Sequence, residues 1–353
     1  MNLAKHRLAI DRLDARIVEL LNERTRNVLE IGRMKLRARQ EIYAPHRELA
    51  VLERVARMTK GPLTGDLLKA IYREIMSGAL ALQKTLIIAY FGPAGTFTHL
   101  AAIRRFGSSL NYSPQKTIGD VFTEVSKGQA DYGVVPVENS TEGVVTHTLD
   151  MFVDSQLKIV SQIVLPIQHT LASRGRKSQI RRIYSHPQAL AQCRGWLQQN
   201  LPKAEIIETS STTRAAELAA RHRHAGAIAS SLAAQRYNLV VVEHNIQDSA
   251  TNATRFLVLG RQDTPPTGQD RTSLLVSVSD RVGALHDAIA AFRRHRINMT
   301  KIESRPSKRR AWEYFFFIDC DGHISHPRVT KAVKAIGKHC SFVKVLGSYP
   351  KAE

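Results

Sequence analysis

The sequence predicts a multidomain protein that joins an all-α segment, an α/β segment and an α+β segment. Residues 1–84 have the pattern of helices almost throughout and show no alternation of period two. From Leu86 onward, short apolar strands alternate with helices, which is typical of an α/β domain. After a polar stretch at 261–271 the order becomes strand, helix, strand, strand, helix, strand. A chain of 353 residues is long enough for two or three such domains.

Three helices are expected in the first segment. The first runs to about Arg39, the second from Ala44-Pro45 to near Lys60-Gly61-Pro62, and the third from about Thr64 to Lys84. In the first helix, heptads counted from Leu3 give a stripe with alternating spacings of four and three, as in a packed helix.

Three cations, Arg7, Arg24 and Lys35, interrupt this stripe, and too few acids lie on it to pair them. A buried cation is costly without an anion, so the stripe favours an anionic ligand. The alternative is that the three side chains extend along the helix surface into water. Arg24 and Lys35 would lie roughly 16 Å apart and could bracket a small dianion, whereas Arg7 lies roughly 25 Å from Arg24. Arg7 can therefore complete a site only on another chain, which predicts an intertwined helical dimer.

The middle segment is expected to contain substantially parallel sheets. Its predicted strands are 86–92, 132–137, 158–165, 180–185, 204–209, 225–230, 239–244 and 255–260. Small polar residues follow four of the strands, at 92–98, 138–143, 185–188 and 210–213. Three of these loops open helices, whose free N–H groups and dipole attract anions, and such loops tend to meet in one crevice. Each loop taken alone is better explained as ordinary helix capping.

Thr254 and Arg255 open the last of these strands. A hydroxyl beside a guanidinium suits protonation of a leaving group next to a bound carboxylate. In the third segment the order of elements is the ferredoxin-like arrangement. There, Gly283-Ala284 would let the backbone approach a ligand closely at the start of a helix, although a glycine at this place also suits an ordinary turn.

The composition limits the classes of function. Net charge is +20, which is compatible with nucleic acid, acidic lipid or anionic substrates as partners, and the basic residues are spread over the whole chain. Cys193, Cys320 and Cys340 lie far apart, which favours free thiols in a reducing cytosol and no metal site. No apolar run reaches the length of a membrane span, and we expect no signal peptide.

The loops of the middle segment together resemble prephenate dehydratase. The matching stretches are GPAGTFTHLAA (92–102), GQADYGVVPVENSTEG (128–143), YSHPQALAQC (184–193), TSSTTRAAE (209–217) and NATRF (252–256). The resemblance implies two α/β lobes like a type II periplasmic binding protein, with the site between them. It also implies a cofactor-free conversion of prephenate to phenylpyruvate in which Thr254 protonates the departing hydroxyl. The expected substrate-binding residues are Thr96, Glu138, Asn139, Ser185, Gln192, Ser211, Thr254, Arg255 and Phe256.

The first segment resembles the all-helical chorismate mutase of the bacterial bifunctional P-protein, through LDARIVELLNER, IGRMK and HRELAVLERV. The residues that match its active site are Arg7, Arg24, Lys35, Arg47, Glu48 and Gln83. A Claisen rearrangement needs a chair-shaped substrate and positive donors near the ether oxygen. The resemblance assigns Lys35 and Gln83 to that oxygen, the arginines to carboxylates and Glu48 to the ring hydroxyl. The sequence departs from the pattern at Ala44, where an acid is usual, and at Ala79, where a hydroxyl is usual.

The third segment resembles an ACT regulatory domain, through GALHD (283–287) and ESRP (303–306). The resemblance implies feedback binding of L-phenylalanine at a domain interface in a dimer, which favours a state with a less competent dehydratase cleft. The residues expected to bind it are Gly283, Ala284, Leu285, Glu303, Ser304, Arg305 and Pro306.

Together the resemblances predict a cytoplasmic, bifunctional enzyme of L-phenylalanine biosynthesis. The predicted domains are 1–84, 86–260 and 272–353, with a linker at 261–271. The expected partners are chorismate, prephenate and L-phenylalanine, with no cofactor, metal, nucleic acid or membrane, in a homodimer or a higher oligomer. Arogenate stays open as a second substrate of the dehydratase.

Two other interpretations stay open at this point. A DNA-binding regulator would suit the charge, but a helix-turn-helix needs short helices, whereas the first helix here is long and has Gly32 as its only Gly or Pro. The other interpretation is an amino-acid sensor that has lost catalysis.

Overall fold

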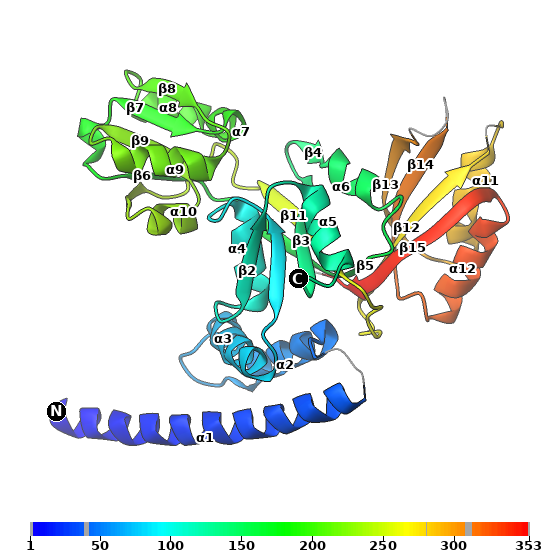
Figure 1. The fold of residues 1–353 in the computed structure, drawn as a ribbon, viewed down its shortest axis with the longest axis horizontal. Helices are drawn as coiled ribbons and strands as arrows, with labels where there is room; N and C mark the ends of the chain where they lie inside the picture. The colour runs from blue at the N-terminus through cyan, green and yellow to red at the C-terminus, as the bar shows by residue number, and fades with distance from the viewer. Residues whose placement is uncertain (1–2, 39–41, 280, 308–312, 352–353) are drawn as a thin grey trace. The chain divides into compact units, whose positions relative to one another are not determined.

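The computed structural model describes residues 3–38, 42–279, 281–307 and 313–351 (Figure 1). The chain divides into two compact units, Met1–Ile87 with Arg105–Asn111, and Ile88–Arg104 with Tyr112–Glu353.

The first unit contains the three predicted helices, α1 (Leu3–Arg37), α2 (Pro45–Met58) and α3 (Gly65–Gln83). The predicted end of the first helix, Arg39, lies outside the described residues. Proline at the first position of α2 and the Thr64 side chain, which accepts from Leu67 N–H at the start of α3, explain where these helices begin. Val51, Leu52 and Val55 of α2 pack against α3 in a small apolar core.

The stripe of α1 is exposed along its first half and only partly covered along its second half, where Ile31 is still 52% exposed. Leu3, Ile10 and Ile17 are 65%, 54% and 52% exposed. Farther along, Gly32 is the buried residue of the helix, and a Cβ atom there would lie 2.5 Å from Oε1 of Gln83 on α3. A side chain at position 32 would therefore displace the Gln83 side chain where α1 and α3 approach each other.

The second unit begins with two lobes, each built on one sheet. The first sheet has the order β2-β1-β3-β11-β5, with β4 paired to β3. Its strands are β1 (Ile87–Phe91), β2 (Asn111–Gln115), β3 (Tyr132–Asn139), β4 (Gly143–Val144), β5 (Lys158–Pro166) and β11 (Ala253–Gly260), and the associated helices are α4 (Phe97–Phe106), α5 (Ile118–Ser126) and α6 (Thr146–Met151).

The second lobe has a sheet of order β10-β6-β9-β7-β8. Its strands are β6 (Thr170–Ser173), β7 (Arg182–Ser185), β8 (Glu205–Glu208), β9 (Ala225–Ala229) and β10 (Val240–Glu243), and its helices are η1 (Lys177–Gln179), α7 (Pro187–Gln192), α8 (Arg194–Asn200), α9 (Thr212–Arg221) and α10 (Ser231–Arg236). Alanines of β9 and α9 form much of one core cluster, so these elements pack closely.

The prediction of substantially parallel sheets is wrong in part. β1 runs parallel to β3, and β7 runs parallel to both β8 and β9. In contrast, β11 is antiparallel to β3 and β5, and β6 is antiparallel to β9 and β10. The reason is that the chain crosses to the second lobe after β5 and returns after β10, so β11 enters the first sheet from the other lobe.

The third segment forms a sheet of order β13-β14-β12-β15 and confirms the predicted order of elements. Its elements are β12 (Asp270–Val278), α11 (Ala284–Arg294), β13 (Met299–Pro306), β14 (Tyr314–Asp321), α12 (Pro327–Gly337) and β15 (Cys340–Pro350). Figure 1 shows α11 and α12 together on one face of this sheet, where Leu274, Val276 and Ile318 pack against them.

The opposite face of this sheet lies against the first lobe. A Cβ atom at Gly347 of β15 would be 2.3 Å from the carbonyl oxygen of Ile159 on β5, so only glycine fits at this crossing. Lys158 Nζ donates to the carbonyl of Val345 at 3.1 Å. The ferredoxin-like domain and the first lobe are therefore joined through β5 and β15. β12 begins at Asp270, so the last two residues of the predicted linker already belong to this sheet.

None of the helices in the described part of the chain combines the length and apolarity that crossing a bilayer requires. The three cysteines are free, as predicted; Cys193 and Cys320 are buried.

Candidate functional site

The helical unit gathers cations around α1. Arg24 and Lys35 are half-buried, whereas Arg7 and Arg47 are exposed. Arg24 Nη1 is buried and has no hydrogen-bond partner among the described residues. Lys35 Nζ donates to the carbonyl of Ile42 at 2.9 Å, and burial lowers the pKa of its ammonium group. Arg24 is thus a donor available for an anion.

Gln83 lies against the same stretch of α1. Its side chain contacts the Gly32 position, one helical turn before Lys35, and its Nε2 donates to the carbonyl of Ala79 at 3.3 Å. Ala79 is 5% exposed, and Ala44 is the N-cap residue of α2 without a side-chain cap. Ala79 therefore lies beside Gln83, and Ala44 precedes the helix that carries Arg47 and Glu48.

Glu48 is paired with a cation that we did not predict. Arg105 Nη1 lies 3.4 Å from Glu48 Oε2, and both side chains are 14% exposed. Burial raises the pKa of Glu48, although Arg105, Arg73 and a hydrogen bond from Tyr43 oppose the shift. Arg105 comes from α4, far from Glu48 in the sequence, so local patterns gave no indication of this pair.

In the second unit, a chain of amide and hydroxyl groups joins the two lobes. Asn139 Nδ2 donates to Thr254 Oγ1 at 2.8 Å and to Asn252 Oδ1 at 2.9 Å. Asn252 Nδ2 donates to Gln192 Oε1 of the second lobe at 2.9 Å. The structure therefore brings together Thr254, Asn139 and Gln192, three of the predicted residues, through the unpredicted Asn252.

His169 ends this chain in the segment between β5 and β6. Its Nε2 lies 2.9 Å from Gln192 Oε1, and its side chain contacts Phe97 edge-on with ring centroids 5.3 Å apart. Burial lowers the pKa of His169, opposed by the hydrogen bond to Gln192, so the neutral form is favoured. No sequence motif pointed to His169.

The polar loops meet in pairs across the lobes. Ser230 Oγ donates to the carbonyl of Gly95 at 2.7 Å, and a Cβ atom at Gly95 would lie 3.3 Å from Thr213 Oγ1. Gln192 Nε2 lies 3.3 Å from Glu142 Oε1. The loops 92–98 and 138–143 of the first lobe thus contact the second lobe, whereas the crevice itself stays a prediction.

Four of the predicted residues serve local structure. Ser185 is buried and donates to the carbonyl of Ile228 at 2.7 Å. Ser211 caps α9 by accepting from Arg214 N–H at 3.0 Å. Thr96 accepts from His99 N–H at 3.4 Å, and Phe256 is 1% exposed.

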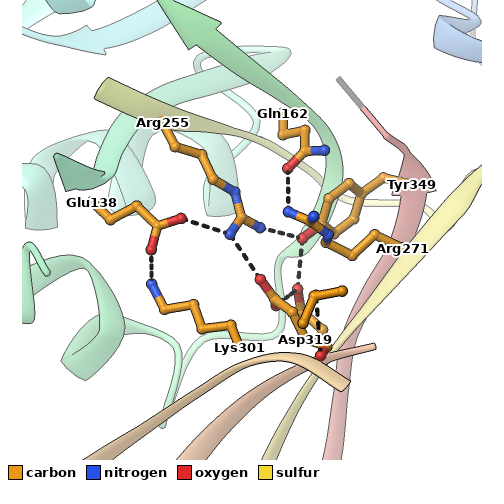
Figure 2. A network of polar contacts seen from close by, with 9 residues as sticks. Glu138, Gln162, Arg255, Arg271, Lys301, Asp319 and Tyr349 are labelled. Carbon is orange, nitrogen blue, oxygen red and sulfur yellow. Dashed lines mark hydrogen bonds and ion pairs between the residues drawn. The ribbon is translucent and has the colours of Figure 1, made fainter. Parts of the chain in front are cut away.

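Arg255 and Glu138 lie apart from the Thr254 group. Figure 2 shows Arg255 between Glu138 and Asp319, a residue of the ferredoxin-like domain. Adjacent residues of a strand point to opposite faces, so Arg255 cannot share a face with Thr254. The alternation of side chains between the two faces of the strand at 252–256 could have shown from the sequence that Thr254 and Arg255 point to opposite faces.

Arg255 carries a stabilised charge. Burial disfavours its guanidinium, but Tyr349, Asp319 and Glu138 together raise its pKa. The pKa of Glu138 is lowered, because Lys301 and Arg255 outweigh the effect of burial.

The residues predicted to bind L-phenylalanine lie at two places of the ferredoxin-like domain, the start of α11 and the strand β13. Gly283 precedes α11 with φ of 81°, a left-handed conformation that favours glycine. Ala284 is buried and Leu285 is half-buried. On β13, Ser304 and Pro306 are exposed, whereas Glu303 and Arg305 are half-buried.

Within the described ranges no group of three or more His, Cys, Asp or Glu side chains is placed to hold a metal ion.

Family models match the chain in the predicted order. The model for chorismate mutase type II matches residues 6–84, that for prephenate dehydratase matches 88–264, and that for the ACT domain matches 272–338. The bifunctional chorismate mutase/prephenate dehydratase of Aquifex aeolicus is 49% identical over 355 residues, which cover 99% of this chain and 98% of that protein.

Solved structures match the second unit. Prephenate dehydratase from Arthrobacter aurescens in complex with L-Phe has a TM-score of 0.71 and 34% identity, covering 76% of this chain and 90% of that one. The quorum-quenching acylase GqqA has a TM-score of 0.70 and 28% identity, covering 75% of this chain and 98% of that one.

The titration of His99 is a direct test of the first polar loop. Its ring stacks on Tyr90 with centroids 4.5 Å apart, and its Nδ1 accepts from Gly95 N–H at 3.1 Å, which requires an unprotonated Nδ1. Burial, and then the charge of Arg236, lower the pKa of His99 to about 4 from the usual 6.5. The unfolded chain therefore binds this proton first, and the stability that His99 contributes is present above pH 6.5 and is lost towards pH 4.

The measurement is an NMR titration of the His99 Cε1–H signal in the folded protein, assigned with a His99→Gln variant. We expect a midpoint near pH 4. A midpoint at the usual value of 6.5 would contradict the hydrogen bond from Gly95.

Proposed function

The chain belongs to the family of bifunctional chorismate mutase/prephenate dehydratases, and we infer that it carries out both reactions in sequence. Chorismate rearranges to prephenate in the helical unit, and prephenate loses water and carbon dioxide to give phenylpyruvate in the two-lobed part. The observation that carries this conclusion is the full-length match to a bifunctional relative, with the polar residues of both segments in place.

In the mutase reaction, negative charge grows on the ether oxygen of chorismate as the bond breaks. We assign Lys35 and Gln83 to that oxygen and Arg7, Arg24 and Arg47 to the carboxylates, with Glu48 at the ring hydroxyl. The buried, unpartnered Nη1 of Arg24 supports this assignment, because such a donor is satisfied only by an acceptor from outside the described residues.

In the dehydratase reaction, we assign proton donation to Thr254. Asn139 Nδ2 donates to Thr254 Oγ1, which leaves the hydroxyl hydrogen free to point at a ligand. Asn139 Oδ1 accepts from the N–H groups of Thr141 and Glu142, which fixes the orientation of its amide. A hydrogen bond accepted by the oxygen polarises the O–H bond, so Asn139 prepares Thr254 as a proton donor. Binding of prephenate would also involve Gln192, Thr96, Ser185, Ser211 and Phe256.

We assign feedback inhibition by L-phenylalanine to the ferredoxin-like domain. The relative from Arthrobacter aurescens was solved with L-Phe. The left-handed Gly283 turn before α11 and the exposed Ser304 of β13 leave backbone and hydroxyl groups accessible, as an amino-acid ligand requires.

We propose a homodimer built on α1. The exposed apolar residues along the first half of this helix would be covered by a second copy, which also brings Arg7 to the partner's cations. We place the enzyme in the cytoplasm, where free thiols such as the three cysteines persist.

Separate substitutions should divide the two activities. Lys35→Ala should lower chorismate turnover by about 10²–10³-fold, because one electrostatic contact to the transition state is lost. Thr254→Ala should lower phenylpyruvate formation by about 10²–10⁴-fold, because the proton donor is lost. Each variant should keep the other activity, measured with chorismate or prephenate as the substrate. Loss of both activities in either variant would refute this division.

Mixed chains test the dimer. In a statistical mixture of Arg7→Ala and Lys35→Ala chains, heterodimers contain one site with neither change, so about a quarter of wild-type mutase turnover should return. The matched control mixes Arg24→Ala with Lys35→Ala chains. In the proposed dimer the same chain supplies Arg24 and Lys35 to a site, so every site in this mixture lacks one of them and no activity should return. Equal recovery in both mixtures, or in neither, would contradict the shared site.

The effector site is tested on β13. Ser304→Ala should raise the L-phenylalanine concentration needed for half-inhibition on the order of tenfold, the loss of one hydrogen bond to a charged ligand. The control is Ser341→Ala, an exposed serine of β15 in the same sheet. Unchanged inhibition of the Ser304 variant would show that L-phenylalanine does not contact this strand.

A further inference from the structure

β3 and β11 form a ribbon with two functional faces. In their antiparallel register, Thr254 pairs with Asn139 and Arg255 pairs with Glu138. Because successive side chains of a strand alternate between faces, the proposed catalytic pair lies on one face and the charged pair on the other. Whatever holds the charged pair therefore also sets the position of the catalytic pair.

The charged pair is held by the ferredoxin-like domain (Figure 2). Arg255 Nη1 donates to Glu138 Oε1 at 2.9 Å and to Asp319 Oδ2 at 2.8 Å. Lys301 Nζ donates to Glu138 Oε2. Glu138, Arg255, Lys301 and Asp319 are the four-charge cluster, in which two cations and two anions balance.

The cluster is sensitive to the loss of any member. The Arg255 side chain is 9% exposed and that of Asp319 is 10% exposed, so little water screens them. Removing one partner leaves a buried charge uncompensated, which a protein relieves by moving the remaining groups. The anchoring is firm on the side of the ferredoxin-like domain, because Ser273 Oγ donates to Asp319 Oδ1 and Tyr349 OH lies 2.9 Å from Arg255 Nη2.

β13 connects this cluster to the proposed effector site. Its half-buried residues include Lys301 and Arg305, and Arg305 contacts Asp150 of α6 at 3.3 Å. Its alternate residues, Ile302 and Ser304, are exposed. One strand thus carries the proposed ligand contact on one face and two ion pairs to the first lobe on the other.

We propose that Lys301 and Asp319 are positioning residues of the dehydratase reaction. Through Glu138 and Arg255 they hold β3 and β11 in the register that sets Asn139 against Thr254, and an effector on β13 inhibits by displacing this contact. The proposal rests on the dehydratase activity and the effector site assigned above. It gives Glu138 and Arg255 a role behind the site, in place of the substrate contact that the family resemblance implies.

A small displacement is enough. The hydrogen bond between Asn139 and Thr254 is 2.8 Å long, and misplacement of a reacting group by about 1 Å can cost about a hundredfold in rate. The side chains that bind prephenate are not changed by a substitution in the cluster. The displacement should therefore lower kcat more than it changes KM.

The test uses Asp319→Asn and Lys301→Met in the full-length protein. Asp319→Asn keeps the shape and the oxygen facing Ser273 but removes the charge facing Arg255. Each variant should lower the dehydratase kcat about ten- to a hundredfold with little change in KM for prephenate. Inhibition by L-phenylalanine should be largely lost. The Kd for L-phenylalanine, measured by calorimetry, should stay equal or become lower. If binding of the ligand breaks the contact, loss of the contact must favour binding of the ligand to the same extent. Lys301→Arg, which keeps the charge, should restore kcat and inhibition.

A matched ion pair of the same sheet is the control. Lys351 Nζ lies 2.8 Å from Asp321 Oδ1, and Asp321 follows Asp319 by two residues on β14. Asp321→Asn and Lys351→Met should leave kcat, KM and inhibition unchanged. The proposal is overturned if Asp319→Asn behaves like Asp321→Asn, or if Asp319→Asn weakens binding of L-phenylalanine, as damage to the domain would. A wild-type enzyme that is inactive or is not inhibited would instead refute the proposed function.

Discussion

The pairing of β3 with β11 is the constraint on which the two-lobed part depends. The chain leaves the first sheet after β5, builds the second lobe and returns as β11, so Thr254 meets Asn139 only when this long excursion closes. A slip of one residue would exchange the faces of the strand and put Arg255 where Thr254 belongs. The register is secured on both faces, by the Asn139–Thr254 hydrogen bond on one and by the Glu138–Arg255 ion pair on the other.

The helical unit solves a different electrostatic problem, since it must keep a cationic site in a folded protein. Glu48 is paired with Arg105, so its carboxylate does not neutralise Arg24, Lys35 or Arg47. The pKa of His46 is lowered by burial and then by Lys35 and Arg47, so this histidine adds no charge that would need a further anion. The surplus of positive charge suits a small dianion better than it suits an empty pocket.

Most elements were predictable from apolar runs, because buried strands and amphipathic helices leave clear periodic patterns. Three strands were missed. β2 (Asn111–Gln115) is polar and contains Pro114, and β4 (Gly143–Val144) and β6 (Thr170–Ser173) are too short to leave a periodic pattern. The motif loops identified Thr254, Asn139 and Gln192, but Asn252 and His169 matter only through partners far away in the chain. Asp319 and Lys301 could not be found from patterns at all, because their role depends on how two domains pack.

The edge position of β13 explains how a ligand could act on the first lobe. β13 ends the sheet order β13-β14-β12-β15, so among the described residues it is paired with β14 alone, and a movement of β13 does not have to displace a second neighbouring strand. Lys301 of β13 and Asp319 of β14 are register partners, yet they hold different strands, β3 through Glu138 and β11 through Arg255. A slide of β13 along β14 would therefore pull Glu138 away from Arg255. Glu138 and Arg255 are next to Asn139 and Thr254 on the same two strands, so a movement at the edge of this sheet would act next to the proposed proton donor.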